Sequence, residues 1–190
     1  MQLNRIAETK MLYKEIILKN GQTCILRQPQ VVDAQDILDY MSNICAETDF
    51  LTFGRDEMVW TLEEEEKFIK EHLEDSNKMI TVAQIDKNIV GITDFTGGKQ
   101  NRIHHFGELG ITVLRKYWSL GIGSALIETL IEWAKNSGVV HKINLRVRVD
   151  NKRAIKLYKK FGFIKEGTIS RQLLIENVFY DVYIMGLEID

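Results

Sequence analysis

The stretch best suited to chemistry is a pair of glycines near the middle of the chain, in Gly121-Ile122-Gly123-Ser124. The preceding residues predict a strand over 105–114 and a bend over 115–120, and the glycines open a predicted helix that ends near Asn136. Glycines at a helix start let the backbone approach a ligand and leave successive N–H groups pointing outward. The helix dipole adds positive charge there, so the turn could bind a phosphate or pyrophosphate group. Taken alone, such a turn is more often only a tight turn.

A second group of residues lies on the next predicted helix, after a strand over 141–149 in which apolar and polar residues alternate. Its pattern reads Asn151-x-x-Ala154-Ile155-x-Leu157-Tyr158-x-x-x-Gly162-Phe163. Asn151, or Asp150 before it, can cap this helix. The phenol of Tyr158 can donate a proton. The strand over 105–114, the helix that the two glycines open and the strand over 141–149 form a crossover unit, which we expect to be right-handed and parallel.

Together the two patterns resemble the signatures of the GNAT superfamily of N-acetyltransferases. The first, Val113-x-x-x-x-Trp118-x-x-Gly121-x-Gly123, is similar to the family's acetyl-coenzyme A signature, in which Arg or Gln usually stands where this chain has Trp118. The pair Tyr117-Trp118 looks like the branch that contains ribosomal-protein and other amino-terminal acetyltransferases. The resemblance implies an α+β (mixed α/β) GNAT fold. Such a fold has a twisted, mostly antiparallel sheet with a parallel pair at the cofactor site and helices on both faces.

The resemblance also implies roles for individual residues. Acetyl-coenzyme A is the expected co-substrate, Asn151 lies near its pantetheine arm, and Tyr158 lies near its sulfur as general acid for the leaving thiolate. Backbone near Val113 would stabilise the oxyanion. The predicted cofactor-binding residues are Ile111, Val113, Leu120, Gly121, Ile122, Gly123, Ser124, Asn151 and Ala154.

Direct attack by a primary amine requires that the amine first lose a proton. A lysine-like amine with a pKa of ~10.4 is neutral about once in 2,500 molecules at pH 7, whereas an α-amino group with a pKa of ~8 is far less restricted. Glu108 is the candidate base, acting through a water, or it could bond only to neighbouring backbone. Residue parity places it on the opposite strand face from Val113 unless a bulge intervenes. His104 and His105 are alternatives, unless they are surface histidines.

Composition fits one globular domain over residues 1–190, with residues 1–13 as an appended arm. The chain is 45% hydrophobic and 27% charged, with a formal net charge of −2. We therefore expect no nucleic-acid or membrane partner. Cys24 and Cys45 are expected to be buried thiols in a cytoplasmic protein, and no Cys or His spacing predicts a metal site. A homodimer is possible.

Other segments predict elements that frame the site. Asn20-Gly21 predicts a type I′ hairpin turn, and residues 33–44 predict a helix. Thr61 and Glu64 form a capping box that starts a helix ending near Leu73, with Leu62, Phe68, Ile69 and Leu73 buried and Glu63–Glu66 as a solvated first turn. Loop 45–58 mixes apolar and charged residues, so it either packs as core or walls an acceptor pocket. The full predicted order is β–β–α–α–β–β–β–α–β–α–β–β.

Other classes of function fit the glycine motif less well. A P-loop needs Lys and Ser/Thr after the second glycine, where Ser124-Ala125 stand, and a dinucleotide-binding turn needs a glycine at Leu126. A sensor that binds acetyl-coenzyme A without catalysis is the non-enzyme alternative. For an enzyme, the acceptor is a protein amino terminus or a small amine such as a polyamine, amino sugar or amino acid.

Overall fold

The computed structural model describes residues 13–54, 57 and 60–190 and has the predicted element order throughout that part. The arm predicted over residues 1–13 lies outside the described residues except for Tyr13, which begins the first strand. The strands are β1 (Tyr13–Ile17), β2 (Thr23–Arg27), β3 (Lys78–Ile85), β4 (Asn88–Gly97), β5 (Phe106–Val113), β6 (Lys142–Arg148), β7 (Ile164–Ile175) and β8 (Val178–Glu188). The α-helices are α1 (Ala34–Glu47), α2 (Leu62–Glu74), α3 (Ile122–Ser137) and α4 (Lys152–Lys160).

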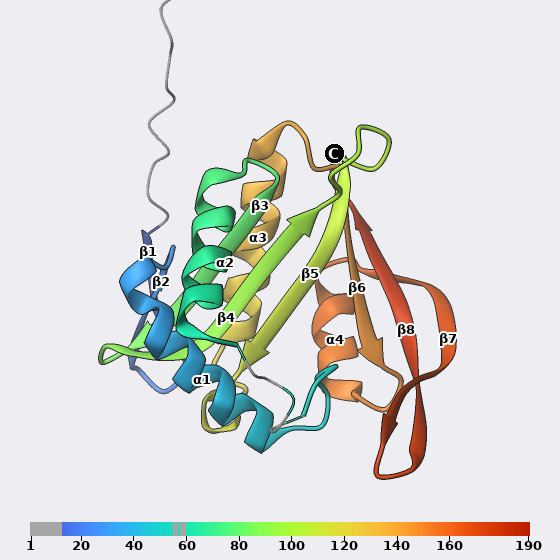
Figure 1. Ribbon diagram of the computed structural model, residues 1–190, viewed down its shortest axis with the longest axis horizontal. Helices are drawn as coiled ribbons and strands as arrows, with labels where there is room; N and C mark the ends of the chain where they lie inside the picture. The colour runs from blue at the N-terminus through green and yellow to red at the C-terminus, as the bar shows by residue number, and fades with distance from the viewer. Residues whose placement is uncertain (1–12, 55–56, 58–59) are drawn as a thin grey trace, which may run out of the picture.

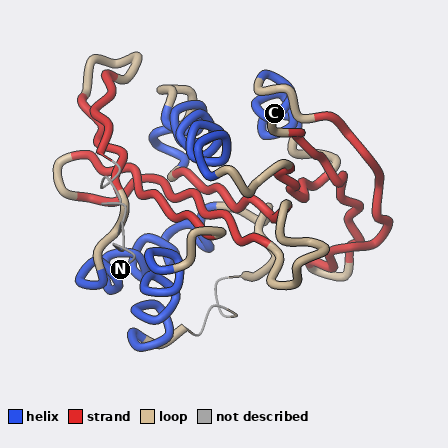
Figure 2. Tube along the Cα trace, turned by 90° about the horizontal axis from the view of Figure 1, so that it is seen from above, coloured by secondary structure: helices blue, strands red, loops and turns tan. Residues whose placement is uncertain are grey.

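Within the described residues the strands form one twisted sheet in the order β1-β2-β3-β4-β5-β6-β8-β7. Helices cover both faces of the sheet (Figure 2). One buried cluster packs α3 and α4 against the sheet through Leu130, Ile155 and Phe95, among others. A second packs α1 and α2 against the opposite face through Ile37, Ile69 and their neighbours. The mixed sheet and its two helical layers confirm the predicted fold class.

The parallel pair β5–β6 is short, and the strands diverge beyond it (Figure 1). Only Phe106, Gly107 and Glu108 of β5 pair with β6, opposite Lys142, Ile143 and Asn144. Beyond Glu108, β5 stays paired with β4 through Val113, while β6 stays paired with β8 through Arg148. The sheet is therefore parted between β5 and β6, directly in front of the α3 N-terminus and α4.

Helix α2 begins with the predicted capping box, but only two of its four predicted core residues, Phe68 and Ile69, pack into the core. Thr61 and Glu64 exchange hydrogen bonds as expected. Leu62 and Leu73, predicted to be buried, are 44% and 38% exposed. Ile69 is buried as predicted, and Glu65 and His72 share its buried face at spacings of four and three. The apolar residues alone therefore located only part of the buried face, because two polar side chains complete it.

The hairpin turns differ in which of their central residues have positive φ. At Asn20-Gly21 only the glycine has positive φ, 84°, so the predicted type I′ turn is wrong. Both central residues have positive φ at Asp86-Lys87 and at Glu176-Asn177, although none of the four is glycine. Strand β7 pairs with β8 along its whole length, with register shifts near Gly167 and Arg171.

Candidate active site

A cleft of about 1440 Å³ occupies the gap between β5 and β6 and extends under α1 and α2. Both sequence motifs border it. Eight of the nine predicted cofactor-binding residues line the cleft, namely Ile111, Val113, Gly121, Ile122, Gly123, Ser124, Asn151 and Ala154. Leu120 does not line it. Its side chain packs against the small cluster between β1–β3 and α3, and its carbonyl accepts from the Lys19 N–H at 3.1 Å.

The two glycines of the turn differ in their surroundings. Gly121 is the N-cap of α3 with φ 114° and ψ −12°, a conformation that favours glycine. Gly123 lies against α4, where an added Cβ would approach Leu157 Cδ2 to 3.2 Å. The first intrahelical bond runs from the Ala125 N–H to the Gly121 carbonyl, so the preceding N–H groups remain available to a ligand. The turn thus presents N–H donors and positive helix dipole to the cleft.

The bend before the glycines is held by Trp118. Its indole N–H donates to the Val113 carbonyl at 2.6 Å, which ties the bend to the end of β5. Two guanidinium groups stack on the ring, Arg115 at 5.6 Å and Arg153 at 4.5 Å. Arg153 also donates to Ser119 Oγ at 2.9 Å. Where the family has Arg or Gln, this chain therefore uses an aromatic ring to position cationic side chains beside the turn, and motif reasoning did not single out Arg153.

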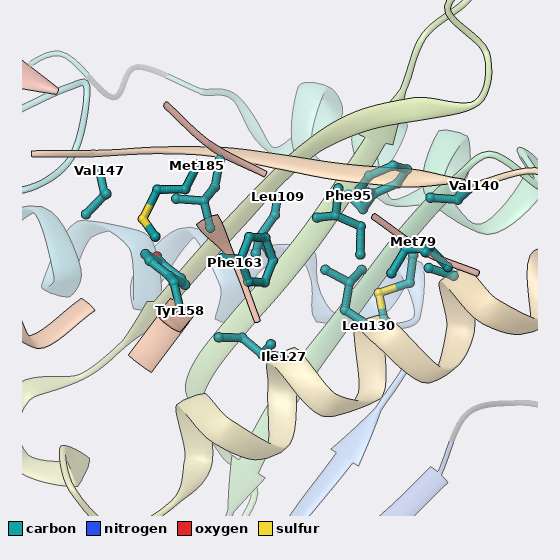
Figure 3. Packing of buried hydrophobic residues seen from close by; sticks show 14 of the residues in the cluster. Met79, Phe95, Leu109, Ile127, Leu130, Val140, Val147, Tyr158, Phe163 and Met185 are labelled. Carbon is teal, nitrogen blue, oxygen red and sulfur yellow. The ribbon is translucent and has the colours of Figure 1, made fainter. Parts of the chain in front are cut away.

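Helix α4 places Tyr158 at the inner wall of the cleft. Asn151 caps the helix by accepting from the Ala154 N–H at 3.1 Å, whereas Asp150 pairs with Arg148. Tyr158 is 7% exposed and packs beside Phe163 and Met185 (Figure 3). Burial raises the pKa of Tyr158 to about 12. The phenol therefore stays protonated at neutral pH and is able to donate.

Glu108 is the last residue of β5 that pairs with β6, and it lies on the face covered by α1 and α2. The β4–β5 register runs without a shift through the described ladder, so parity holds and Glu108 and Val113 point to opposite faces. Glu108 accepts a hydrogen bond from Arg146 at 2.9 Å and is half exposed. Both Glu108 and Tyr158 line the cleft, which joins the two faces through the gap in the sheet. Neither His104 nor His105 lines it.

Two further carboxyl groups line the cleft beside Glu108, and sequence reasoning missed both. Glu65 of α2 is buried, and burial together with the nearby Asp94 raises the pKa of Glu65 to about 7. Burial and the nearby Glu108 raise the pKa of Asp94 on β4 to about 6. The spacing of Glu65 to Ile69 and His72 was the available signal for its inward position. The prediction that Glu63–Glu66 form a solvated turn is therefore wrong at Glu65.

The described part of the 45–58 loop walls the cleft. Phe50, Leu51, Phe53 and Glu57 line it, and Leu51 also packs against the α1–α2 cluster. Arg148 anchors the loop. Its guanidinium stacks on Phe50 at 4.7 Å and donates to the Asp49 carbonyl at 2.9 Å. The alternative that this loop bounds a pocket therefore fits the structure better than packing as core alone.

Cys24 and Cys45 are buried free thiols, as predicted. Among the described residues, no three His, Cys, Asp or Glu side chains are placed to hold a metal ion. In the same part of the chain, none of the helices has both the length and the apolar character needed to cross a membrane.

Comparisons with known proteins agree with the motifs and the geometry. Residues 44–163 match the model of the acetyltransferase (GNAT) family. The L-amino acid N-acetyltransferase AaaT of Escherichia coli is 38% identical over 105 residues, which are 55% of this chain and 65% of that enzyme. The spermidine N(1)-acetyltransferase of Vibrio cholerae is 25% identical over 146 residues, which are 76% of this chain and 83% of that enzyme.

A solved structure extends the similarity to nearly the whole described chain. The crystal structure of a GNAT-family acetyltransferase from Streptococcus pneumoniae superposes with a TM-score of 0.85 at 35% identity, covering 88% of this chain and 99% of that one. The family match covers more than half of the chain and includes the glycine turn, the helix α4 and the strands that part in front of them. The chain belongs to the GNAT family of acetyltransferases.

Proposed function

We propose that this protein transfers an acetyl group from acetyl-coenzyme A to a primary amine by direct attack. The observation that carries the proposal is the cleft in the parted sheet, which brings the glycine turn, the Tyr158 phenol and the Glu108 carboxylate to one cavity. The similar enzymes from E. coli and V. cholerae are named for amino acid and spermidine acceptors. Both acceptors are amines, which supports this class of acceptor for this chain.

In this proposal the turn at Gly121 holds the pyrophosphate of acetyl-coenzyme A. The N–H groups of Ile122, Gly123 and Ser124 are the available donors, and Arg153 adds positive charge at the rim. The arm of the cofactor follows the free edge of β5 toward Glu108, past Ile111 and Val113. Acetyl-coenzyme A supplies the activated acyl group, and the chain's residues orient it and move protons.

Tyr158 and Glu108 manage the two proton transfers. Tyr158 donates to the leaving sulfur, and burial keeps its phenol protonated across the range in which amines react. Glu108 collects the proton of the amine through a water, and Arg146 holds its carboxylate in place. Because these residues lie on opposite faces of the sheet, the acceptor approaches from the α1–α2 side and the thiol leaves on the α4 side.

Thiol release from acetyl-coenzyme A, followed colorimetrically with a panel of amines and peptides, tests the proposal. We expect release that depends on an amine, together with a mass increase of one acetyl group on the acceptor. Acetyl-coenzyme A binding without release for any small amine or peptide amino terminus would favour the alternative of a non-catalytic acetyl-coenzyme A sensor.

The homodimer, the cytoplasmic location and the roles of individual site residues stay predictions.

A further inference from the structure

Three carboxyl groups lie in a row that begins at the point where β5 and β6 part. Glu108 lies at that point on β5, Asp94 lies on the neighbouring strand β4, and Glu65 lies above them on α2. Thr96 pairs with Glu108 and Asp94 pairs with Gly110, so Asp94 and Glu108 are diagonal neighbours on one face. All three carboxyl residues line the same cleft. The series therefore runs from the predicted transfer point into the pocket beneath α1 and α2.

Of the three carboxyl groups, that of Glu65 most clearly lacks a hydrogen-bond partner. Its side chain is 2% exposed, and its Oε1 has no hydrogen-bond partner among the described residues. An unpartnered buried carboxyl oxygen is costly to the folded state. A ligand that enters the cleft and forms a hydrogen bond with this oxygen would offset that loss of stability.

Asp94 is accommodated in the same pocket by the absence of a side chain on β5. A Cβ on Gly110 would collide with Asp94 Oδ1, so glycine at this position leaves the carboxyl room to lie across the neighbouring strand. The side chain lines the cleft beside Glu65. Burial and then the nearby Asp94 raise the pKa of Glu65, whereas burial and then the nearby Glu108 raise the pKa of Asp94.

Among the residues that the structure describes, no cation forms an ion pair with Glu65 or Asp94. Arg146 on β6 is engaged with Glu108. His72, on the same face of α2 as Glu65, contacts the Phe68 carbonyl and Thr96 Oγ1, and its pKa is lowered mainly by burial, so it is neutral near pH 7. A positively charged ligand group would complete the site.

We propose that Glu65 and Asp94 bind a second ammonium group of the acceptor, so that the preferred acceptors are diamines or polyamines. This inference rests on the proposed acetyl transfer and names its acceptor class. The reacting amine sits at Glu108, and the distal ammonium lies between Asp94 and Glu65. Apolar side chains suited to the methylene chain between the two amines also line the cleft, including Ile37, Ile44, Phe68, Ile80 and Ile92.

The test compares α,ω-diamines of three to six carbons with amino alcohols of the same lengths. Each pair has the same reacting amine and differs only in the distal group. For at least one length, we expect the wild-type kcat/KM for the diamine to exceed that for the amino alcohol by about tenfold to a hundredfold, mainly through KM. Calorimetry with the protein and no acetyl donor should show the same preference for 1,4-diaminobutane over 4-amino-1-butanol if four carbons is the favoured length.

Glu65→Gln and Asp94→Asn should each reduce this ratio toward one, because each neutralises one of the two carboxyl groups. Each variant is checked for folding by circular dichroism, and either one that folds suffices. Glu63→Gln is the matched control, since Glu63 lies on the exposed side of the same helix. It should keep the wild-type ratio. For the wild type the ratio should rise from pH 6 to pH 8, as Asp94 and then Glu65 lose their protons beside the Glu108–Arg146 pair and neutral His72.

Equal kcat/KM values for every diamine and its amino alcohol would overturn this inference and leave acetyl transfer to amines standing. A ratio that survives in both Glu65→Gln and Asp94→Asn would overturn the assignment of these residues. Absence of thiol release with every amine would overturn the proposed function itself, and this inference with it.

Discussion

The two sides of the cleft carry opposite charge and are built by different means. On the α3–α4 side, backbone N–H groups at Gly121 and the guanidinium of Arg153 present positive charge. On the α1–α2 side, Glu65, Asp94 and Glu108 present carboxyl groups. In the proposed function, the first side binds the anionic donor and the second binds the cationic acceptor. The two substrates then meet at the gap between β5 and β6, the seam of the sheet.

The two sides also differ in how much they lower the stability of the folded protein. Donors at a helix N-terminus exist in every helix, so presenting them to a ligand adds little cost. Buried carboxyl groups must be desolvated, and their raised pKa values record that cost. The acceptor side should therefore dominate the pH dependence of stability, and the donor side should dominate cofactor affinity.

The largest expected effect concerns stability and Glu65. Its pKa rises from 4.5 to about 7 on folding, so the folded state holds the proton more tightly than the unfolded state. The free energy of unfolding should then fall as the pH rises from about 4.5 to about 7, by at most about 3 kcal/mol from this group. Glu65→Gln should flatten that part of the curve, while the smaller contribution of Asp94, with the same sign, remains. Urea unfolding at pH 5 and pH 8 measures the change.

The control for this prediction is Glu63→Gln, whose curve should run parallel to that of the wild type. A Glu65→Gln curve that also runs parallel would show that this carboxyl is not desolvated in the folded protein. The contrast between a costly acceptor side and an inexpensive donor side would then fail.

The next largest effect is expected at the seam itself. Tyr158→Phe removes the proton donor for the leaving sulfur and should lower kcat on the order of 100-fold. Acetyl-coenzyme A affinity should hardly change, because the proton is needed in the transition state and not in the bound ground state. Steady-state kinetics and calorimetry separate the two quantities.

Tyr183→Phe is the matched control, because Tyr183 packs at the same cluster but does not line the cleft. An unchanged kcat in Tyr158→Phe, with acetyl transfer shown to limit the rate, would remove Tyr158 as general acid.

A smaller effect should isolate the donor side. Gly121→Val strains the backbone at φ 114° and crowds the turn, so acetyl-coenzyme A should bind at least about tenfold more weakly. Gly138→Val serves as control, since Gly138 also has positive φ, at the opposite end of α3 and away from the cleft. Calorimetry that finds equal affinity in the folded Gly121→Val variant would exclude this turn as the cofactor site.

The smallest effect is expected at Glu108 and at alkaline pH. Glu108→Gln should slow acetyl transfer most near pH 7, where few acceptor amines are neutral, and by about tenfold or less near pH 8.5 for an acceptor of low pKa. Rate–pH profiles of both proteins on one acceptor measure this. Superimposable profiles would return Glu108 to a structural role beside Arg146.

Sequence reasoning served the donor side far better than the acceptor side, for a physical reason. The turn, its helix and the Asn151 cap are specified by residues close together in the chain, and glycine and cap preferences act locally. The family resemblance covered the same stretch. The element order followed from hydrophobic periodicity for the same local reason.

The acceptor side could not be assembled in this way, because its residues come from three separate elements. Glu65 stands in a run of four glutamates, and such a run normally faces solvent. Only the register of β4 against β5 and the rotation of α2 bring Glu65, Asp94 and Glu108 together. Leu120 was predicted from its place beside the glycine turn, but its side chain packs in a neighbouring cluster and does not line the cleft.

The three-residue pairing of β5 with β6 has a consequence for how the molecule deforms. Hydrogen bonds across a sheet resist shear, and this seam has few of them between two well-paired halves, β1–β5 and β6–β8–β7. The halves are also joined by the crossing of Arg148, which stacks on Tyr180 of β8 at 3.8 Å and on Phe50 of the loop after α1. Where the backbone pairing stops, side chains hold the two halves together, through Arg148 and through the buried cluster that includes Leu109 of β5 and Leu145 of β6.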